Sequence, residues 1–176
     1  MKVFGVAGWS GMGKTTLLAR LVPVLIARGL VVSLVKHSHK DIEVDRQGKD
    51  SYRLREAGCH EVLLLGASRW ALMHELRGAK EPALGEMLAR LAPCDLVLLE
   101  GFKEGDFPKL EIWRAEPGRR LLWPQWPGIV GIATDAAALP EPDPGIPHPP
   151  LLALEDIEAI ADFVLAHAAQ ALPSTG

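Results

Sequence analysis

Cysteine, net charge and long apolar runs are all scarce in this 176-residue chain. Two cysteines, Cys59 and Cys94, are too few for a disulfide framework, so we expect both to be reduced and buried in a cytoplasmic protein. The net charge of −3 excludes the basic footprint of a nucleic-acid-binding protein and a polybasic membrane patch. No apolar run approaches membrane-spanning length, and the apolar start at Val3 is too short for a signal peptide.

The composition is that of a globular protein, with 48% hydrophobic and 23% charged residues. The length suits one domain, which we place at residues 1–172, followed by a frayed tail at 173–176. Predicted strands alternate with predicted helices along the chain. This alternation predicts an α/β fold of three layers, with a mostly parallel sheet and helices on both faces.

Residues 8–15 match G-x-x-x-x-G-K-[ST], the phosphate-binding P-loop or Walker A motif. An apolar run over residues 3–7 precedes the motif and a helical pattern follows it, which is the order of elements that the motif needs. The alternative is a glycine turn before an ordinary helix, and the Lys-Thr ending disfavours it. We predict a helix over residues 14–28 that is distorted at Pro23 and ends at Gly29.

Each residue type in this loop has a physical role. Glycines let the backbone wrap around an anion, while the backbone N–H groups and the helix N-terminus supply positive charge. Lys14 is expected to reach the β- and γ-phosphates of a nucleotide, and Thr15 to coordinate Mg²⁺. The nucleotide-binding residues predicted here are Ser10, Gly11, Met12, Gly13, Lys14, Thr15 and Thr16.

Three further segments place polar residues directly after apolar strands, at the sheet edge where open α/β folds bind ligands. Residues 95–100 form a buried strand that ends in Glu100, a candidate to hold Mg²⁺ with Thr15 and to act with Lys14 in catalysis; a solvent-facing acid is the alternative. Asp95 begins the same strand and lies at the opposite edge. Asp135 follows a strand at 129–133, either as an acceptor for guanine N1 and N2 or as a turn residue.

The strand at residues 31–35, expected to be buried on both faces, leads into the polar segment KHSHKD at 36–41. Lys36 and His37 are candidate ligands of a γ-phosphate or substrate. A metal site with His37, His39 and Asp41 is the minority interpretation, and a solvated loop is a third.

The remaining pattern predicts a helix at 50–58, strands at 61–65 and 70–76, and a helix at 81–91. Strands at 110–114 and 121–123 around a turn at 116–119 predict a hairpin extension, residues 129–133 the final strand, residues 140–150 a proline-rich surface loop, and residues 157–168 a helix. Lys49, Arg53 and Arg55 either serve a phosphorylated ligand or form a solvated helix face. Trp113, Trp123 and Trp126 either anchor a partner or belong to the core.

Together these motifs resemble the molybdopterin-guanine dinucleotide biosynthesis accessory protein B family. The matching stretches are GWSGMGKTTL at 8–17, VKHSHKD at 35–41, GKDSYRLREAG at 48–58, DLVLLEGFK at 95–103 and PKLE at 108–111. The resemblance implies a cytoplasmic GTP-binding protein with weak GTPase activity that assists a molybdopterin guanylyltransferase. It also implies a homodimer formed partly by strand pairing, which we expect at the hairpin of residues 109–123, with Ile112 on its apolar face.

Guanine preference rests on this resemblance, because the N-K-x-D motif is absent from the sequence. Direct binding of molybdopterin stays open. The alternatives are a P-loop kinase acting on a small hydroxyl substrate, a metal-delivery GTPase using His37, His39 and Cys94, and a non-catalytic nucleotide-binding module.

Overall fold

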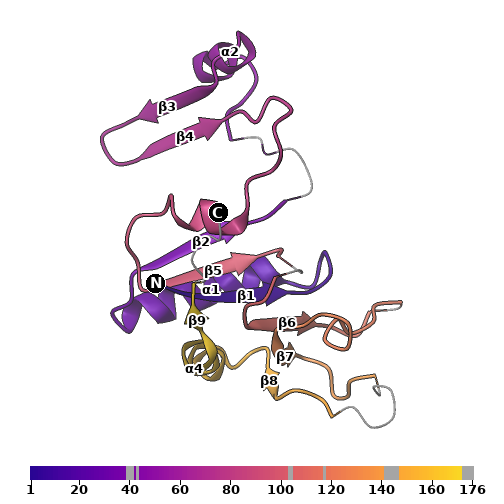
Figure 1. The fold of residues 1–176 in the computed structure, drawn as a ribbon. Helices are drawn as coiled ribbons and strands as arrows, with labels where there is room; N and C mark the ends of the chain where they lie inside the picture. The colour runs from indigo at the N-terminus through magenta and orange to yellow at the C-terminus, as the bar shows by residue number, and fades with distance from the viewer. Residues whose placement is uncertain (39–41, 43, 103–104, 117, 141–146, 172–176) are drawn as a thin grey trace.

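A computed structural model describes residues 1–38, 42, 44–102, 105–116, 118–140 and 147–171. Six parallel strands form the main sheet in the order β2-β5-β1-β6-β7-β8, and the short β9 pairs antiparallel with β1 (Figure 1). The strands are β1 (Lys2–Ala7), β2 (Val32–Lys36), β5 (Leu96–Glu100), β6 (Lys109–Trp113), β7 (Ile129–Thr134), β8 (Leu151–Ala153) and β9 (Ala169–Gln170). Because the six strands are parallel, their carboxyl ends lie at one edge of the sheet.

Helices α1 (Lys14–Ala27) and α4 (Ile157–His167) cover one face of this sheet. Their apolar residues pack with the alternating inward side chains of β1, β5 and β6, which gives the largest buried cluster of the molecule. The short α3 (Leu84–Leu88) packs against β5 on the other face through Leu88. The predicted three-layer α/β fold is therefore confirmed.

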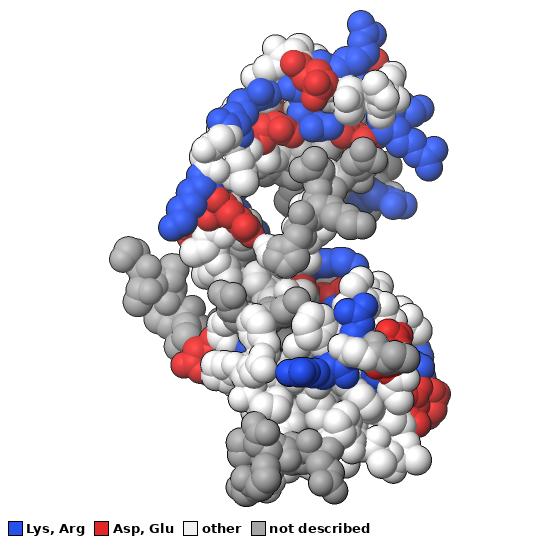
Figure 2. All heavy atoms as spheres, turned by 90° about the vertical axis from the view of Figure 1, so that its right-hand side faces the viewer, with Lys and Arg blue, Asp and Glu red and all other residues white. Residues whose placement is uncertain are grey.

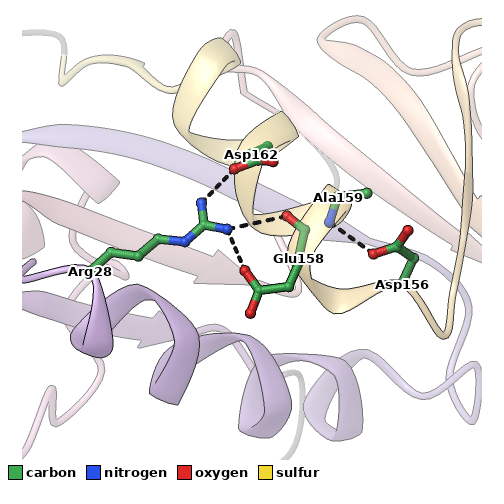
Figure 3. Close-up of polar contacts among 5 residues, drawn as sticks. All are labelled: Arg28, Asp156, Glu158, Ala159 and Asp162. Carbon is green, nitrogen blue, oxygen red and sulfur yellow. Dashed lines mark hydrogen bonds and ion pairs between the residues drawn. The ribbon is translucent and has the colours of Figure 1, made fainter.

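Polar contacts fix the two long helices to each other (Figure 3). Arg28, at the C-terminus of α1, donates to Glu158 at 2.5 Å and to Asp162 at 2.6 Å on α4. The two carboxylates raise the pKa of Arg28 above its usual value. Asp156 caps α4 by accepting a hydrogen bond from the backbone of Ala159 at 3.0 Å.

A second unit, made of α2 (Asp50–Glu56), β3 (Glu61–Leu65) and β4 (Trp70–His74), stands away from the main sheet (Figure 1). The two strands pair antiparallel as a hairpin. Arg55 of α2 makes ion pairs of 3.0 Å with Glu75, directly after β4, and with Asp45, which precedes α2. These contacts raise the pKa of Arg55. Of the two roles left open for Arg55, the structure shows neither, because its guanidinium is held within the protein.

Several predicted elements need correction. Residues 109–113 do not form a hairpin with 121–123: β6 is a central parallel strand between β1 and β7, and residues 121–123 form no strand. The hairpin extension lies instead at β3–β4. Strand β2 is not buried on both faces, because it is the edge of the sheet. Strands β8 and β9 follow β7, which is therefore not the last strand.

Other predictions fare better. α1 ends one residue early at Ala27 with Pro23 inside it, α3 is shorter than expected, and α2 and α4 match closely. Both cysteines are free, but Cys59 is exposed and Cys94 is only half-buried. Residues 141–146 of the proline-rich loop and the tail at 173–176 lie outside the described residues. Within the described residues, every helix is too short or too polar to span a bilayer.

Candidate functional site

The P-loop occupies the carboxyl end of β1 and is shaped by two glycines. Gly8 has a φ of +142°, and a Cβ there would lie 2.6 Å from the backbone oxygen of Ile112, so a side chain at this position would force the loop away from β6. Gly13 has a φ of +92° and begins α1 without a side-chain cap. The N-terminal N–H groups of α1 are therefore left for an anion.

Lys14 folds back over this loop. Its Nζ donates to the backbone oxygens of Gly8 and Trp9, both at 2.8 Å. A lysine ammonium prefers anionic oxygens to neutral carbonyls, because charge-assisted hydrogen bonds are the stronger ones. The side chain is thus held against the backbone of the loop, and its role as a phosphate ligand stays a prediction.

Thr15, Glu100 and Lys36 meet beside the P-loop. The Thr15 hydroxyl donates to Oε1 of Glu100 at 2.7 Å, and Lys36 Nζ lies 3.2 Å from each of these two oxygens. Strand pairing sets this arrangement, because Lys36 on β2 is level with Glu100 on β5, which is level with Val6 on β1. Glu100 is buried, so it is not the solvent-facing acid of the alternative interpretation.

The opposite side of the P-loop carries an ion pair. Arg114, the first residue after β6, donates through Nη1 to Oδ2 of Asp135 at 2.5 Å, and through Nε to the backbone oxygen of Met12 at 3.3 Å. Thr134, not Asp135, makes the local turn contact: its hydroxyl oxygen accepts a hydrogen bond from the Ala136 N–H at 3.0 Å. Sequence reasoning gave Arg114 no role at the site. Arg114 could have been found as a charged residue directly after a buried strand, but the sequence pattern places this strand in a hairpin outside the site.

A segment after β6 lies against the P-loop. The indole Nε1 of Trp9 donates to the backbone oxygen of Arg120 at 2.7 Å, and the Arg119 guanidinium carbon lies 5.6 Å from the centre of the Trp9 ring. Glu111 fixes the same segment by accepting from the N–H groups of Leu122 at 2.7 Å and Trp123 at 3.0 Å. We call residues 119–123 the Trp9 platform.

Two charged side chains on β6, those of Lys109 and Glu111, are fully buried. Burial raises the pKa of Glu111 to about 7, although the two backbone N–H groups oppose this change. Lys109 donates to the backbone oxygens of Gly105, Phe107 and Pro127, and burial lowers its pKa. Trp113, on the same face, is buried in the core rather than available to a partner.

His37, the other candidate ligand of the 36–41 segment, lines a neighbouring cavity of about 870 Å³. Its Nε2 lies 3.0 Å from Oε1 of Glu81, and its ring centre is 5.2 Å from that of Phe102. Lys36, His37, Lys80, Arg90 and Phe102 are among the residues that line the cavity. Figure 2 looks onto this side of the molecule and shows a hollow between the outer unit and the main body.

The metal-delivery hypothesis finds no support in the described residues. Cys94 precedes β5 and His37 follows β2, so the two lie at opposite edges of parallel strands. His39 and Asp41 fall outside the described residues. Across the part of the chain that is described, no three His, Cys, Asp or Glu residues gather as metal ligands.

Comparisons with known proteins agree with the resemblance. Residues 3–135 match the family model described as molybdopterin guanine dinucleotide synthesis protein B. The molybdopterin-guanine dinucleotide biosynthesis adapter protein of Escherichia coli K12 is 40% identical over 161 residues, which cover 90% of this chain and 89% of the relative. The Haemophilus influenzae adapter protein is 46% identical over 122 residues, 68% of this chain and 67% of the relative.

Solved structures agree at the level of the fold. Bacillus subtilis MobB superposes with a TM-score of 0.72 at 22% identity, covering 97% of this chain and 100% of that one. A MobB homologue from Bacillus stearothermophilus gives 0.67 at 24% identity, with 93% and 95% covered. From the match to the family model and from these relatives, the chain belongs to the molybdopterin guanine dinucleotide synthesis protein B family.

Proposed function

We propose that this protein is a GTP-binding accessory protein of molybdopterin guanine dinucleotide synthesis, with weak GTPase activity, that assists a partner guanylyltransferase. The relatives named above are called adapter proteins of this synthesis. The observation that carries the proposal is the contact between Thr15 and Glu100 at 2.7 Å beside the open N-terminus of α1. A hydroxyl and a buried carboxylate in contact, next to an anion-binding loop, form the set of groups that a nucleotide with its Mg²⁺ requires.

In this proposal the P-loop backbone from Ser10 to Thr16 holds the phosphates, and Lys14 exchanges the carbonyl oxygens of Gly8 and Trp9 for phosphate oxygens. Thr15 and Glu100 hold Mg²⁺, since both offer the hard oxygen ligands that this ion prefers. Bound Mg²⁺ neutralises charge on the phosphate oxygens. Lys36 lies within reach of the same anionic groups, while His37 belongs to the cavity next to them.

The residues present fit a divalent cation by an independent observation. Glu100 is buried, yet among the described residues its partners are one hydroxyl and the half-exposed ammonium of Lys36. A buried carboxylate is costly unless it is paired, and a dication would compensate it more completely than Lys36 does. Hydrolysis is expected to be slow, because the family resemblance implies weak GTPase activity.

Calorimetric titration with GTP and ATP, with and without Mg²⁺, tests the proposal. Lys14→Ala removes a charge-assisted contact and should weaken GTP binding at least tenfold, by about 1.5–3 kcal/mol, with the fold intact. Lys80→Ala is the matched control, since Lys80 lies in the neighbouring cavity and its loss changes the net charge equally. GTP affinity that is the same in the folded Lys14→Ala variant and the wild type would refute the nucleotide site.

A second assay addresses the accessory role. The protein is added to a molybdopterin guanylyltransferase that transfers GMP from GTP, and formation of the dinucleotide is followed. We expect the wild type to increase the yield and Lys14→Ala to increase it less. An equal effect of both proteins would separate the accessory role from nucleotide binding.

The proposal includes a homodimer, and the hairpin β3–β4 replaces residues 109–123 as its expected interface. Leu65 and Trp70, which face each other in the hairpin register, are 81% and 66% exposed. Further exposed apolar residues on these strands are Leu63, Leu64 and Leu72. An exposed two-stranded hairpin of this kind is unusual in a monomer, and a two-fold axis would cover both copies at once.

Three smaller parts of the proposal follow. The protein acts in the cytoplasm, which suits its free and partly exposed cysteines. Residues 1–172 form one domain that carries the outer unit as an extension. The cavity at His37, which shares Lys36 with the nucleotide site, is where direct binding of molybdopterin is to be tested.

A further inference from the structure

Arg114 and Asp135 form an ion pair beside the P-loop. Arg114 follows β6 and Asp135 follows β7, so both lie at the carboxyl edge on the side of the P-loop away from Glu100. Both side chains are a little over one third exposed. Among described residues, Arg114 Nη2 and Asp135 Oδ1 make no hydrogen bond, so the pair keeps for a ligand one donor group and one oxygen whose two lone pairs can accept two hydrogen bonds.

Arg114 also contacts the start of α1. A Cβ placed on Gly13 would lie 3.7 Å from Nε and 3.8 Å from Nη2 of Arg114, so the guanidinium rests directly on the phosphate-binding loop. A cation at a helix N-terminus is unfavourable, because that end of the helix is already positive. Asp135 compensates for this charge, and the hydrogen bond from Nε to the Met12 oxygen fixes the guanidinium relative to the loop. The pair is therefore held at a constant position relative to the bound phosphates.

Guanine and adenine differ in what they offer to such a pair. Guanine has acceptors at O6 and N7 and donors at N1 and N2, whereas adenine has a donor at N6 and an acceptor at N1. A guanidinium beside a carboxylate matches guanine, because the donor meets O6 and the acceptor meets N1 and N2. Against adenine, donor meets donor and acceptor meets acceptor, and a site built to hydrogen-bond one ligand strongly rejects another that leaves its groups unpaired.

We infer that Arg114 and Asp135 together select guanine, with Asp135 accepting from N1 and N2 and Arg114 donating to O6 while Nε stays on the P-loop. This inference rests on the proposed GTP site and adds Arg114 as a specificity-determining residue. It also explains how guanine can be selected without an N-K-x-D motif: the acidic acceptor comes from the end of β7 and the basic donor from the end of β6.

Binding of GTP, ATP and XTP to the full chain, measured by calorimetry, tests the inference. Arg114→Ala should weaken GTP at least tenfold and change ATP less than threefold, since the two nucleotides share their phosphates. Asp135→Asn should weaken GTP at least tenfold and strengthen XTP at least tenfold, because the xanthine O2 acceptor suits an amide donor. Arg28→Ala is the control, as it removes an arginine at the C-terminal end of α1, the end away from the P-loop and outside the pair.

The outcomes are distinguishable. If Arg114→Ala weakens GTP and ATP equally, the residue supports the P-loop alone and the inference is wrong. If neither variant changes any affinity, the pair is a surface ion pair only. Equal wild-type affinity for GTP and ATP overturns guanine selection while leaving the nucleotide site intact, whereas a wild type that binds none of the three overturns the proposed function as well. Melting temperatures without nucleotide show whether each variant is folded.

Discussion

Replacing Glu111 with Gln should change the pH dependence of stability. Burial raises the pKa of Glu111 to about 7 from its ordinary value of 4.5. A raised pKa means that between pH 4.5 and 7 the folded protein keeps a proton that the unfolded chain has lost. The free energy of unfolding therefore decreases as pH rises through this window and is constant above it. At 1.36 kcal/mol per unit of pKa, the decrease is about 3 kcal/mol.

The Gln side chain does not ionise, so the variant lacks this decrease. It has one carbonyl oxygen for two backbone N–H groups, those of Leu122 and Trp123, and leaving one of them unpaired costs about 1–3 kcal/mol at any pH. The variant should therefore be less stable than the wild type at pH 5 by this amount. At pH 8 the wild type has lost about 3 kcal/mol, so the two proteins should be close in stability.

Urea unfolding followed by circular dichroism at pH 5, 6, 7 and 8 measures the difference. Glu155→Gln is the control, because Glu155 is an exposed carboxylate whose removal should have a small effect that varies little with pH. A Glu111→Gln variant that is destabilised equally at pH 5 and pH 8 would show that Glu111 ionises normally in the folded protein, and the reasoning from burial would be wrong.

Four further outcomes are expected. Glu100→Gln should leave metal-free GTP binding near the wild-type value and reduce the gain in affinity from added Mg²⁺, which the same calorimetry measures. Lys109→Met should lower the free energy of unfolding by about 2–4 kcal/mol in urea, because one buried and two part-buried backbone oxygens lose their charged donor; no loss would mean that water replaces the ammonium. Leu65→Lys should shift the mass in light scattering toward the 19.1 kDa monomer, whereas Ile26→Lys, which alters an exposed apolar residue on α1, should not; a wild type that is already monomeric sinks the dimer. Arg28→Ala should lower the melting temperature, and the effect should shrink in 1 M NaCl, because the ion pairs with α4 are exposed.

The P-loop side of the site was predictable from local pattern. A strand, a glycine loop and a helix in sequence place Lys14 and Thr15, and the rule that parallel strands end at one edge brings Glu100 and Lys36 beside them. These contacts need only parallel strands with β5 next to β1 and β2 next to β5. The position of Asp135 at the same edge was predictable for the same reason, but its partner Arg114 was not.

Strand β6 could not be assigned from sequence because its pattern is misleading. Lys109, Glu111 and Arg114 alternate with apolar residues, which is typical of a strand with one solvated face. The structure buries Lys109 and Glu111 by supplying backbone partners from residues 105–107 and 122–127. The partners at 122–127 are separated from β6 in sequence, and those at 105–107 come directly before it. Neither group carries a side-chain signal, since a backbone N–H or C=O is the same for every residue type.

Strand β2 shows the converse error. Its run of apolar residues is typical of a central parallel strand, yet it lies at the edge of the sheet with Leu34 41% exposed. Strand order cannot be obtained from periodicity. An apolar run has the same pattern whether the strand lies in the middle of the sheet or at its edge. The exposed hairpin β3–β4 is a second case of apolar strands without internal cover.

Packing alone does not explain why β6 carries the buried charges of Lys109 and Glu111, because burying them lowers the stability of the folded protein. A buried carboxylate and a buried ammonium each stabilise the folded protein less than a well-packed apolar residue of similar size would. At neutral pH and above, Glu111 lowers stability by about 3 kcal/mol relative to acid conditions. Its hydrogen bonds fix the Trp9 platform, and Trp9 in turn ties the P-loop to that platform. Because Arg114 at the end of the same strand contacts the P-loop from another side, β6 positions the loop at two points. We therefore attribute the buried charges to the order that a phosphate loop needs before its ligand arrives, since a loop of glycines has little to fix it otherwise.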